Sequence, residues 1–300
     1  MRVNPNQVQN VLAGLQQTQT ALNTALQEVS TGKSVSVPSD NPAASASMVQ
    51  NTIDTQNVDQ YTQNVSGVLS MVQSSDSALS SVVSSLTQAI TLGTEGASGT
   101  TNATNQQAIA TEVQGLLSGV VALANTSYQG TYLFGGTASS QPPYTADPTS
   151  ASGYKYNGNT GVNSVAVGAD LSVQSNLPGS QIFSNASGDV LGSLSSLVSA
   201  LQSGNSSAIQ SATSTISSAL NNVSQQRVFY ANAETQLNSQ ETYLQQETVS
   251  LTSQATSLVG VNMATAATAL AQAQTANAAA LAAASKVLPT TLLSYLIPPQ

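Results

Sequence analysis

The chain has 300 residues, of which 40% are hydrophobic and only 6% charged, and its formal net charge at pH 7 is -8. It contains no histidine and no cysteine, so the commonest catalytic base, the thiolate nucleophile and the thiolate metal ligands are missing. The acidic balance also opposes binding to the phosphates of nucleic acid, which depends on Lys and Arg. We therefore expect no catalytic site, no metal, no cofactor, no small-molecule substrate and no nucleic-acid partner.

The sequence also argues against a membrane protein. No segment reaches the roughly 20 continuous apolar residues that a membrane span needs, and the N-terminus lacks the charged and then apolar layout of a cleaved secretory signal. The alanine-rich run over residues 264–284 is interrupted by polar residues, which fits a helix packed on other helices. We expect no membrane partner and, if the protein leaves the cell, an export route without a cleaved signal.

The first predicted element is a helix over about residues 6–30. Its apolar residues step by seven, with two more on the same stripe: Val8, Leu15, Leu22 and Val29, then Val11 and Ala25. Heptad spacing keeps one narrow seam facing a partner helix. Gly32 should end this helix, and the turn residues up to Asp40 predict a loop. Asn41 is then suited to the N-cap of the next helix, with Pro42 at its first position.

A second helix is expected from there to about Leu92. It carries a heptad ladder with a companion row three residues on from most rungs: Val58, Val65, Val72, Leu79 and Leu86, with Tyr61, Val68, Val82 and Ala89. Gly93, Gly96 and Gly99 are expected to break it. A third helix is predicted to follow Asn102.

The middle of the chain has a different character. Residues 139–183 are rich in Pro, Gly and Tyr, and short alternating runs such as Tyr154 and Tyr156, or Val165 and Val167, lie between turn residues. This pattern is typical of β-hairpins. Helical periodicity returns at Val190 and is expected to pause at Gly204 and Asn205.

The longest ladder lies downstream. It comprises Ile209, Ile216, Val223, Tyr230, Leu237, Leu244, Leu251 and Leu258, which predicts a single helix of roughly 75 Å. Gly260 should separate it from a last helix over residues 262–288, which Pro289 should end.

These elements predict a mainly α fold, an elongated bundle of long antiparallel coiled-coil helices formed by both chain ends, with a small inserted β subdomain. We expect three parts. Terminal coiled-coil assembly segments cover residues 1–32 and 262–300, a central helical rod covers residues 33–138 and 186–261, and the β-hairpin-rich insert covers residues 139–185.

Both ends of the chain resemble one family. Residues 1–44 contain an S-x-G-K turn and a D-N-P-A helix start, at Ser30, Gly32, Lys33, Asp40, Asn41, Pro42 and Ala43. This resembles the N-terminal signature of the bacterial flagellin family and its hook-associated relatives, and residues 261–296 resemble the closing helix of that family. The middle, ANTSYQGTYLFGGT with a later PGSQIF, is similar to the hook-associated branch at the hook-filament junction. One departure is Asn262, where the family often has Asp.

The resemblance implies a structural protein of the bacterial flagellum that joins the hook to the filament. It implies type III flagellar export, an extracellular location in the flagellum, and ordering on assembly. The implied partners are further copies of the chain in a ring-like layer, the adjacent hook-side junction protein, flagellin or filament-side subunits, and an export chaperone. The termini are expected to be mobile in the monomer and helical in the assembly, because each seam needs a partner.

We predict the assembly contacts at apolar residues of the two terminal segments: Val8, Val11, Leu15, Leu22, Leu26 and Val29, with Leu270, Leu281, Leu288, Leu292, Leu293 and Leu296. Core packing within one subunit is the alternative for each, since heptad seams serve both purposes.

Three other functions are alternatives to this role. A filament-forming flagellin would share the fold. A helical secretion translocator or adhesin stalk would need basic or strongly apolar faces that are missing here. An enzyme is disfavoured by the empty catalytic inventory.

Overall fold

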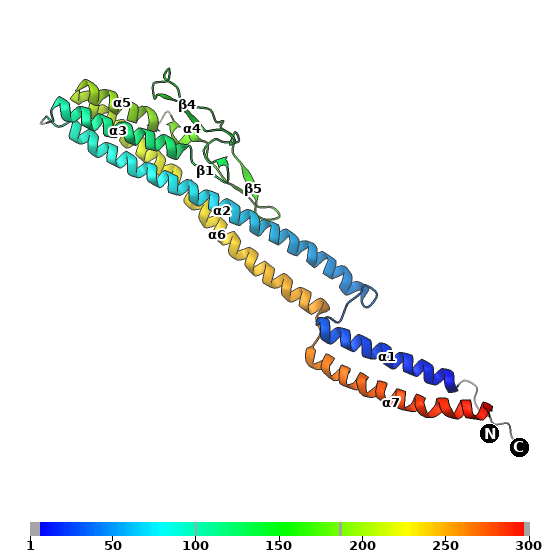
Figure 1. Ribbon diagram of the computed structural model, residues 1–300. Helices are drawn as coiled ribbons and strands as arrows, with labels where there is room; N and C mark the ends of the chain where they lie inside the picture. Colours follow the sequence, from blue (N-terminus) through cyan, green and yellow to red (C-terminus); the bar gives the residue numbers. More distant parts are fainter. Residues whose placement is uncertain (1–6, 100, 186–187, 297–300) are drawn as a thin grey trace. The chain divides into compact units, whose positions relative to one another are not determined.

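The computed structural model describes residues 7–99, 101–185 and 188–296, and their side chains except those of residues 7, 8 and 287–296. Long helices dominate it (Figure 1). They are α1 (Gln7–Thr31), α2 (Pro42–Gly96), α3 (Ala103–Ala124), α5 (Val190–Ser203), α6 (Ser206–Val259) and α7 (Met263–Leu296), with a short α4 (Gly179–Ile182). The predicted mainly α fold with an inserted β region is confirmed.

The strands pair into short antiparallel hairpins between α3 and α5. The pairs are β1 (Ser127–Tyr128) with β2 (Thr131–Tyr132), β3 (Tyr144–Ala146) with β4 (Tyr154–Tyr156), β5 (Ser164–Ala166) with β6 (Ser172–Gln174), and β7 (Ser184–Asn185) with β8 (Gly188–Asp189).

The chain divides into two units. Unit 1 comprises residues 1–57 and 247–300, and unit 2 comprises residues 58–246. Helices α2 and α6 contribute to both units, whereas α1 and α7 belong to unit 1 and the β hairpins to unit 2. The three-part division expected from the sequence stays a prediction.

The heptad ladders form the core of unit 2. On α2, Val65, Val72, Leu79 and Leu86 are each 0% exposed, as are Ile209, Ile216, Val223, Tyr230 and Leu237 on α6. Complete burial of one such apolar side chain stabilises the fold by about 1.5–3 kcal/mol. The two ladders therefore form a continuous apolar seam between α2 and α6.

Polar side chains fix the register of this pair. In unit 2, the Asp76 carboxylate accepts two hydrogen bonds from Arg227, from Nε at 2.8 Å and from an Nη at 2.9 Å, and Gln73 Nε2 donates to Glu234 Oε1 at 3.0 Å. In unit 1, the buried amide of Asn51 donates to the carbonyl oxygen of Leu251 at 3.0 Å. A shifted register would leave such groups without partners, which is how a single buried Asn specifies coiled-coil alignment.

Most predicted helix boundaries are confirmed. Asn102 caps α3 through a hydrogen bond from the Asn105 backbone N–H at 2.8 Å, and Gly204 ends α5 in the left-handed conformation with φ of 67°. Asn41 accepts from the Ala44 N–H at 3.1 Å, so that α2 begins at Pro42 as expected.

Two predicted helix ends were wrong. Helix α2 continues through Gly93 to Gly96, because side chains of α5 and α6 pack where a β-carbon would stand: Leu197 and Thr213 at Gly93, and Leu201 at Gly96. Helix α7 passes Pro289 and ends at Leu296. The φ angle of proline fits a helix, and its missing N–H removes one backbone hydrogen bond from a long helix.

Aromatic side chains anchor the β hairpins. The ring of Phe183 meets that of Phe134 edge to face, with centroids 5.3 Å apart, and that of Tyr144 at 5.8 Å. The Tyr230 hydroxyl, on the buried seam of α6, accepts a hydrogen bond from the Leu177 N–H at 3.2 Å. Burial raises the pKa of Tyr230 well above its ordinary value, since a phenolate would be desolvated there. The hairpin region is thus tied to the core of unit 2.

Helix α3 has the length and hydropathy to cross a membrane, the one such helix within the described part of the chain. Core helices of water-soluble domains pass the same test. Its residues Ile109, Val113 and Leu117 are at most 7% exposed, and the helix packs on α5. This burial inside unit 2 is typical of a core helix.

The Tyr230 contact gives a first prediction. Tyr230→Phe removes the acceptor of the buried Leu177 N–H, so the free energy of unfolding should fall by about 1–3 kcal/mol. Tyr243→Phe is the matched control, because Tyr243 lies on the same helix but is 56% exposed. Urea unfolding followed by circular dichroism measures both, and equal stability of the two variants would contradict the assigned contact.

Candidate assembly interface

The two terminal helices α1 and α7 lie side by side in unit 1 (Figure 1). The buried residues among the described side chains of these two helices are alanines, with Ala25 5%, Ala266 1% and Ala284 7% exposed. One cross-helix hydrogen bond joins the side chains of Thr18 and Asn277 at 3.4 Å. Small side chains allow close approach of the helices but bury little apolar surface each.

The predicted interface residues lie on these two helices. Five of those described are half-buried, namely Val11, Leu15, Leu22, Val29 and Leu270, while Leu26 is 46% and Leu281 52% exposed. The side chains of Val8, Leu288, Leu292, Leu293 and Leu296 lie outside the described residues. Pairing α1 with α7 therefore covers these seams only in part, in contrast to the fully buried seam of α2 and α6.

An open groove runs between α1 and α7. It is lined mainly by small and amide-bearing side chains: Gln17, Thr20, Ala21, Thr24, Ala25 and Glu28 of α1, with Ala269, Gln272, Ala273 and Ala276 of α7. Glu28 is the one carboxylate among these lining residues. A surface of this kind suits close packing against another helix more than recognition of a charged ligand.

Unit 1 also exposes apolar residues that are not among the predicted interface residues. They are Leu12, Val37, Val49, Ile53, Val249 and Met263. Val37 and Val49, with Val35, Met48 and Val259, also line a pocket of about 240 Å³. In unit 2, large exposed apolar side chains among the described residues are restricted to Val162, Val228 and Tyr243. Exposed apolar surface is thus concentrated in unit 1.

The signature turn joins the two connectors of unit 1. Gly32 follows α1 in the left-handed conformation with φ of +67°, and Lys33 forms an antiparallel bridge with Gly260. The Ser34 N–H donates to the Val259 carbonyl at 2.8 Å, and the Val261 N–H donates to the Gly32 carbonyl at 3.0 Å. Ser30 lies exposed in the last turn of α1. These bonds fix how the chain leaves α1 and enters α7.

The rest of the signature shapes the start of α2. The Asp40 carboxylate accepts the backbone N–H groups of Ser36 and Val37, each at 3.0 Å. These hydrogen bonds lower the pKa of Asp40, because they favour the ionised form. Asn41 and Pro42 then supply the N-cap and the first helical residue. The motif therefore has a local structural role that explains its residue types.

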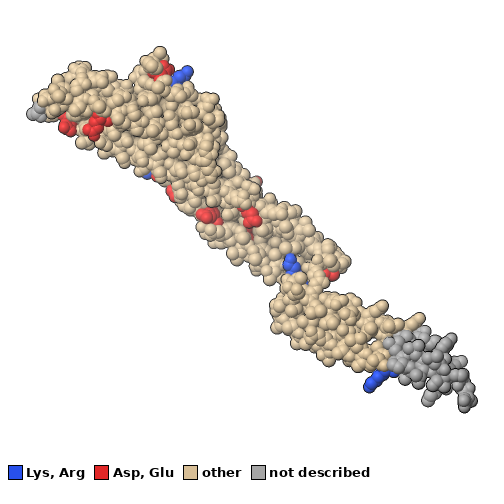
Figure 2. Space-filling model, viewed as in Figure 1, with Lys and Arg blue, Asp and Glu red and all other residues tan. Residues whose placement is uncertain are grey.

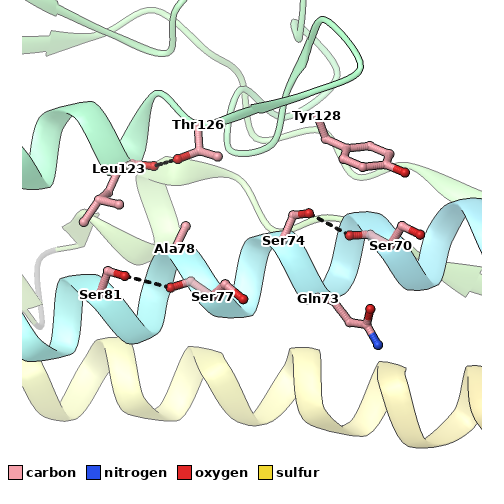
Figure 3. A pocket seen from close by; sticks show the side chains of 9 residues that line it. All are labelled: Ser70, Gln73, Ser74, Ser77, Ala78, Ser81, Leu123, Thr126 and Tyr128. Carbon is pink, nitrogen blue, oxygen red and sulfur yellow. Dashed lines mark hydrogen bonds between the residues drawn. The ribbon is translucent and has the colours of Figure 1, made fainter.

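Unit 2 contains a groove between α2 and the β1–β2 region, shown in Figure 3. Several of its hydroxyl groups donate to backbone carbonyls: Ser74 Oγ donates to the Ser70 carbonyl at 2.8 Å, and Thr126 Oγ1 donates to the Leu123 carbonyl at 2.7 Å. The lining residues include no acid or base. In the described part of the chain, no cluster of three or more His, Cys, Asp or Glu could hold a metal ion.

The fold and its exposed terminal seams define a helical structural protein whose two chain ends meet in one helix pair. A family model described as the bacterial flagellin N-terminal helical region matches residues 3–139. This match confirms the resemblance to the flagellin family that was drawn from the sequence. Among curated proteins, none matches the sequence.

Several solved structures share the fold. FlgL of Bacillus cereus is 22% identical, with a TM-score of 0.60, and the match covers 69% of this chain and 99% of that one. FlgL of Xanthomonas campestris is 16% identical, with a TM-score of 0.60, and the match covers 69% of this chain and 99% of that one. The flagellar junction protein FlgL of Legionella pneumophila is 15% identical, with a TM-score of 0.60, and the match covers 71% of this chain and 100% of that one.

The signature turn gives a second prediction. Gly32→Ala places a β-carbon in the left-handed region, at a cost of about 1–2 kcal/mol, and should weaken the bridge between the connectors. Hydrogen exchange of the Ser34 and Val261 amides should become faster by roughly tenfold per 1.4 kcal/mol. Unchanged exchange at both amides would contradict the assigned role.

Gly14→Ala is the matched control for this variant. Gly14 lies within α1 and has open space around it, so alanine should stabilise the helix by about 1 kcal/mol. The two identical substitutions should therefore change the protection of unit 1 in opposite directions.

Proposed function

We propose that this chain is a structural protein of the bacterial flagellum that joins the hook to the filament. It forms a ring-like layer of identical copies, contacts the hook-side junction protein on one side and flagellin or filament-side subunits on the other, and catalyses no reaction. The likeness to FlgL structures and the flagellin N-terminal region support this role. The observation that carries it is the incompletely covered seam of α1 and α7.

The contrast between the two helix pairs supports assembly as the role of the terminal segments. Within unit 2, nine ladder residues of α2 and α6 are 0% exposed. In the α1–α7 pair, Leu15 and Leu22 stay half-exposed although the helices are in contact. Neighbouring copies can cover this remaining apolar surface, and each buried leucine then contributes about 1.5–3 kcal/mol.

The same property suits export and ordering on assembly. Helix α1 is 25 residues long and has many Ser, Thr, Asn and Gln residues, so its isolated helix is only marginally stable in water. A segment of this kind passes through an export channel unfolded and gains its stability when it docks on neighbours. An export chaperone that covers the seams before assembly fits this sequence of events.

The decisive experiment removes the protein from the organism that carries it. Electron microscopy of the deletion strain should reveal hooks without filaments, and free flagellin should collect in the medium. Filaments of normal length and attachment in this strain would overturn the proposed function.

A filament-forming flagellin remains the second candidate, because the matched family region is that of flagellin. Mixing the purified chain with filament seeds separates the two roles. A flagellin extends the seeds without limit, whereas a junction protein adds a limited layer and stops.

Leu22→Glu gives a third prediction. A carboxylate buried against neighbouring copies without a partner costs several kcal/mol, so incorporation into flagella should fall by more than about tenfold. The ladders of unit 2 are untouched, so the helical content of the purified variant should stay close to wild type. Motility and the amount of protein in isolated flagella measure the effect.

Gln19→Glu is the control, since it adds the same charge at an exposed position on the same helix. It should assemble at near wild-type level. Normal flagella in the Leu22→Glu strain would show that Leu22 is not in the assembly contact.

A further inference from the structure

The charge content of the chain is low enough to limit its response to acid. The sequence has 13 Asp and Glu, 5 Lys and Arg, and no His. Protonation of every carboxylate would leave only the five Lys and Arg charges and the chain terminus on 300 residues. Figure 2 shows how sparsely charged side chains are spread over one face. Repulsion between positive charges expands many proteins in acid. This chain has few positive charges that could repel one another.

The polar contacts between elements are made mostly by groups that do not titrate in acid. The β5–β6 hairpin is held on both long helices by side-chain amides. Asn64 Nδ2 of α2 donates to the Ala166 carbonyl at 2.8 Å, and Gln240 Nε2 of α6 donates to the Val167 carbonyl at 2.9 Å. Two valines of this hairpin region, Val167 and Val173, are 0% and 4% exposed. These two bonds connect the hairpin to α2 and to α6 without a charged group. We call the hairpin with Asn64 and Gln240 the strap.

Side-chain amides also bond to backbone groups of other elements elsewhere in the structure. Asn51 reaches the Leu251 carbonyl, Asn222 the Ile182 carbonyl at 3.3 Å, and Asn125 both backbone groups of Tyr144 at 2.8 Å. An amide side chain keeps its donors and acceptor at any pH between 2 and 7. These cross-element bonds therefore survive acidification.

Four titratable residues lie close in sequence to the bonds of the strap. Asp59 of α2 and Asp170 in the β5–β6 turn are exposed, and Tyr61 of α2 and Glu241 of α6 are half-exposed. None of these four residues is a partner in the bonds to Ala166 and Val167.

Carboxylates accept hydrogen bonds at several places in the described residues. Glu112 of α3 accepts from the amide of Gln88 of α2 at 2.9 Å, and Asp189 accepts from the Gly192 N–H at the start of α5 at 2.9 Å. The Asp76–Arg227 pair has side chains 33% and 32% exposed, and pairs open to solvent contribute little to stability. Glu234 accepts from the amide of Gln73, and a protonated carboxyl group still has a carbonyl oxygen that can accept.

Two aspartates do lose stabilising bonds in acid. Backbone hydrogen bonds lower the pKa of Asp40, and hydrogen bonds from Thr149 lower that of Asp147. Each contributes stability above the unfolded pKa of 3.8 that is lost as the pH falls through its lower folded value. Both groups lie in exposed turns, so the loss is local.

We propose that this protein is adapted to an acidic exterior, and that its folded units persist near pH 2 because they are held together by apolar seams and neutral amide contacts. The low charge content is then a functional property of a protein exposed to a medium well below neutral pH. This inference is independent of the junction role, so either can fail without the other.

Thermal unfolding of the full-length chain, followed by circular dichroism at pH 7 and pH 2.5 at equal ionic strength, tests the proposal. We expect the midpoint to fall by less than about 10 °C, a shift of the size that a few weak contacts produce in a chain of this length. A larger fall, or a chain already unfolded at pH 2.5, overturns the proposal.

A second measurement tests the role of the amide contacts. Gln240→Glu places a carboxylate against the Val167 carbonyl at pH 7, whereas at pH 2.5 the protonated group can donate as the amide does. The variant should therefore unfold several degrees below wild type at pH 7 and match it at pH 2.5. Gln236→Glu, at an exposed position one turn away on α6, is the control and should follow wild type at both values. Identical behaviour of the two variants would refute the assigned role of Gln240.

Discussion

The burial of heptad seams is the constraint on which this structure depends. A helix with a repeat of seven presents one apolar stripe, and the stripe must be covered. In unit 2, the stripes of α2 and α6 are covered by each other and by the other elements of the unit, so this unit has a closed core. In the α1–α7 pair, alanines are buried while the described leucines stay half-exposed or exposed. The proposed assembly role follows from this difference in coverage.

Apolar seams alone do not choose an alignment, because a shift by one heptad would bury a similar surface. Asn51 and the Asp76–Arg227 pair supply that choice, since each has its partner in one register only. The strap made by Asn64, Gln240 and the β5–β6 hairpin adds a connection from each long helix to the same strand end. The protein thus uses few charges and many amides to specify its packing, which links its composition to its proposed tolerance of acid.

The heptad ladders and the residues that begin or end helices made much of the fold predictable. Asn41, Asn102 and Gly204 have local roles that depend on near neighbours in sequence, and each was located correctly. Gly93 was misread because helix propensity describes an exposed glycine, whereas this one leaves room for the Thr213 side chain of α6. Exposed residues such as Val49 and Val249 were missed because a single valine outside a seam gives no periodic signal. The predicted contacts of α1 and α7 lie on one helix pair, but their role in assembly stays a prediction.

The sequence by itself determined which residues form long helices, which stripe of each must be buried, and where most helices begin, because these properties depend on spacing and on local backbone chemistry. Only the tertiary structure decided how completely each stripe is covered, which amides cross from one element to another, and where glycine is needed for close packing. Those features depend on groups far apart in the chain, and residue spacing along one segment carries no information about them.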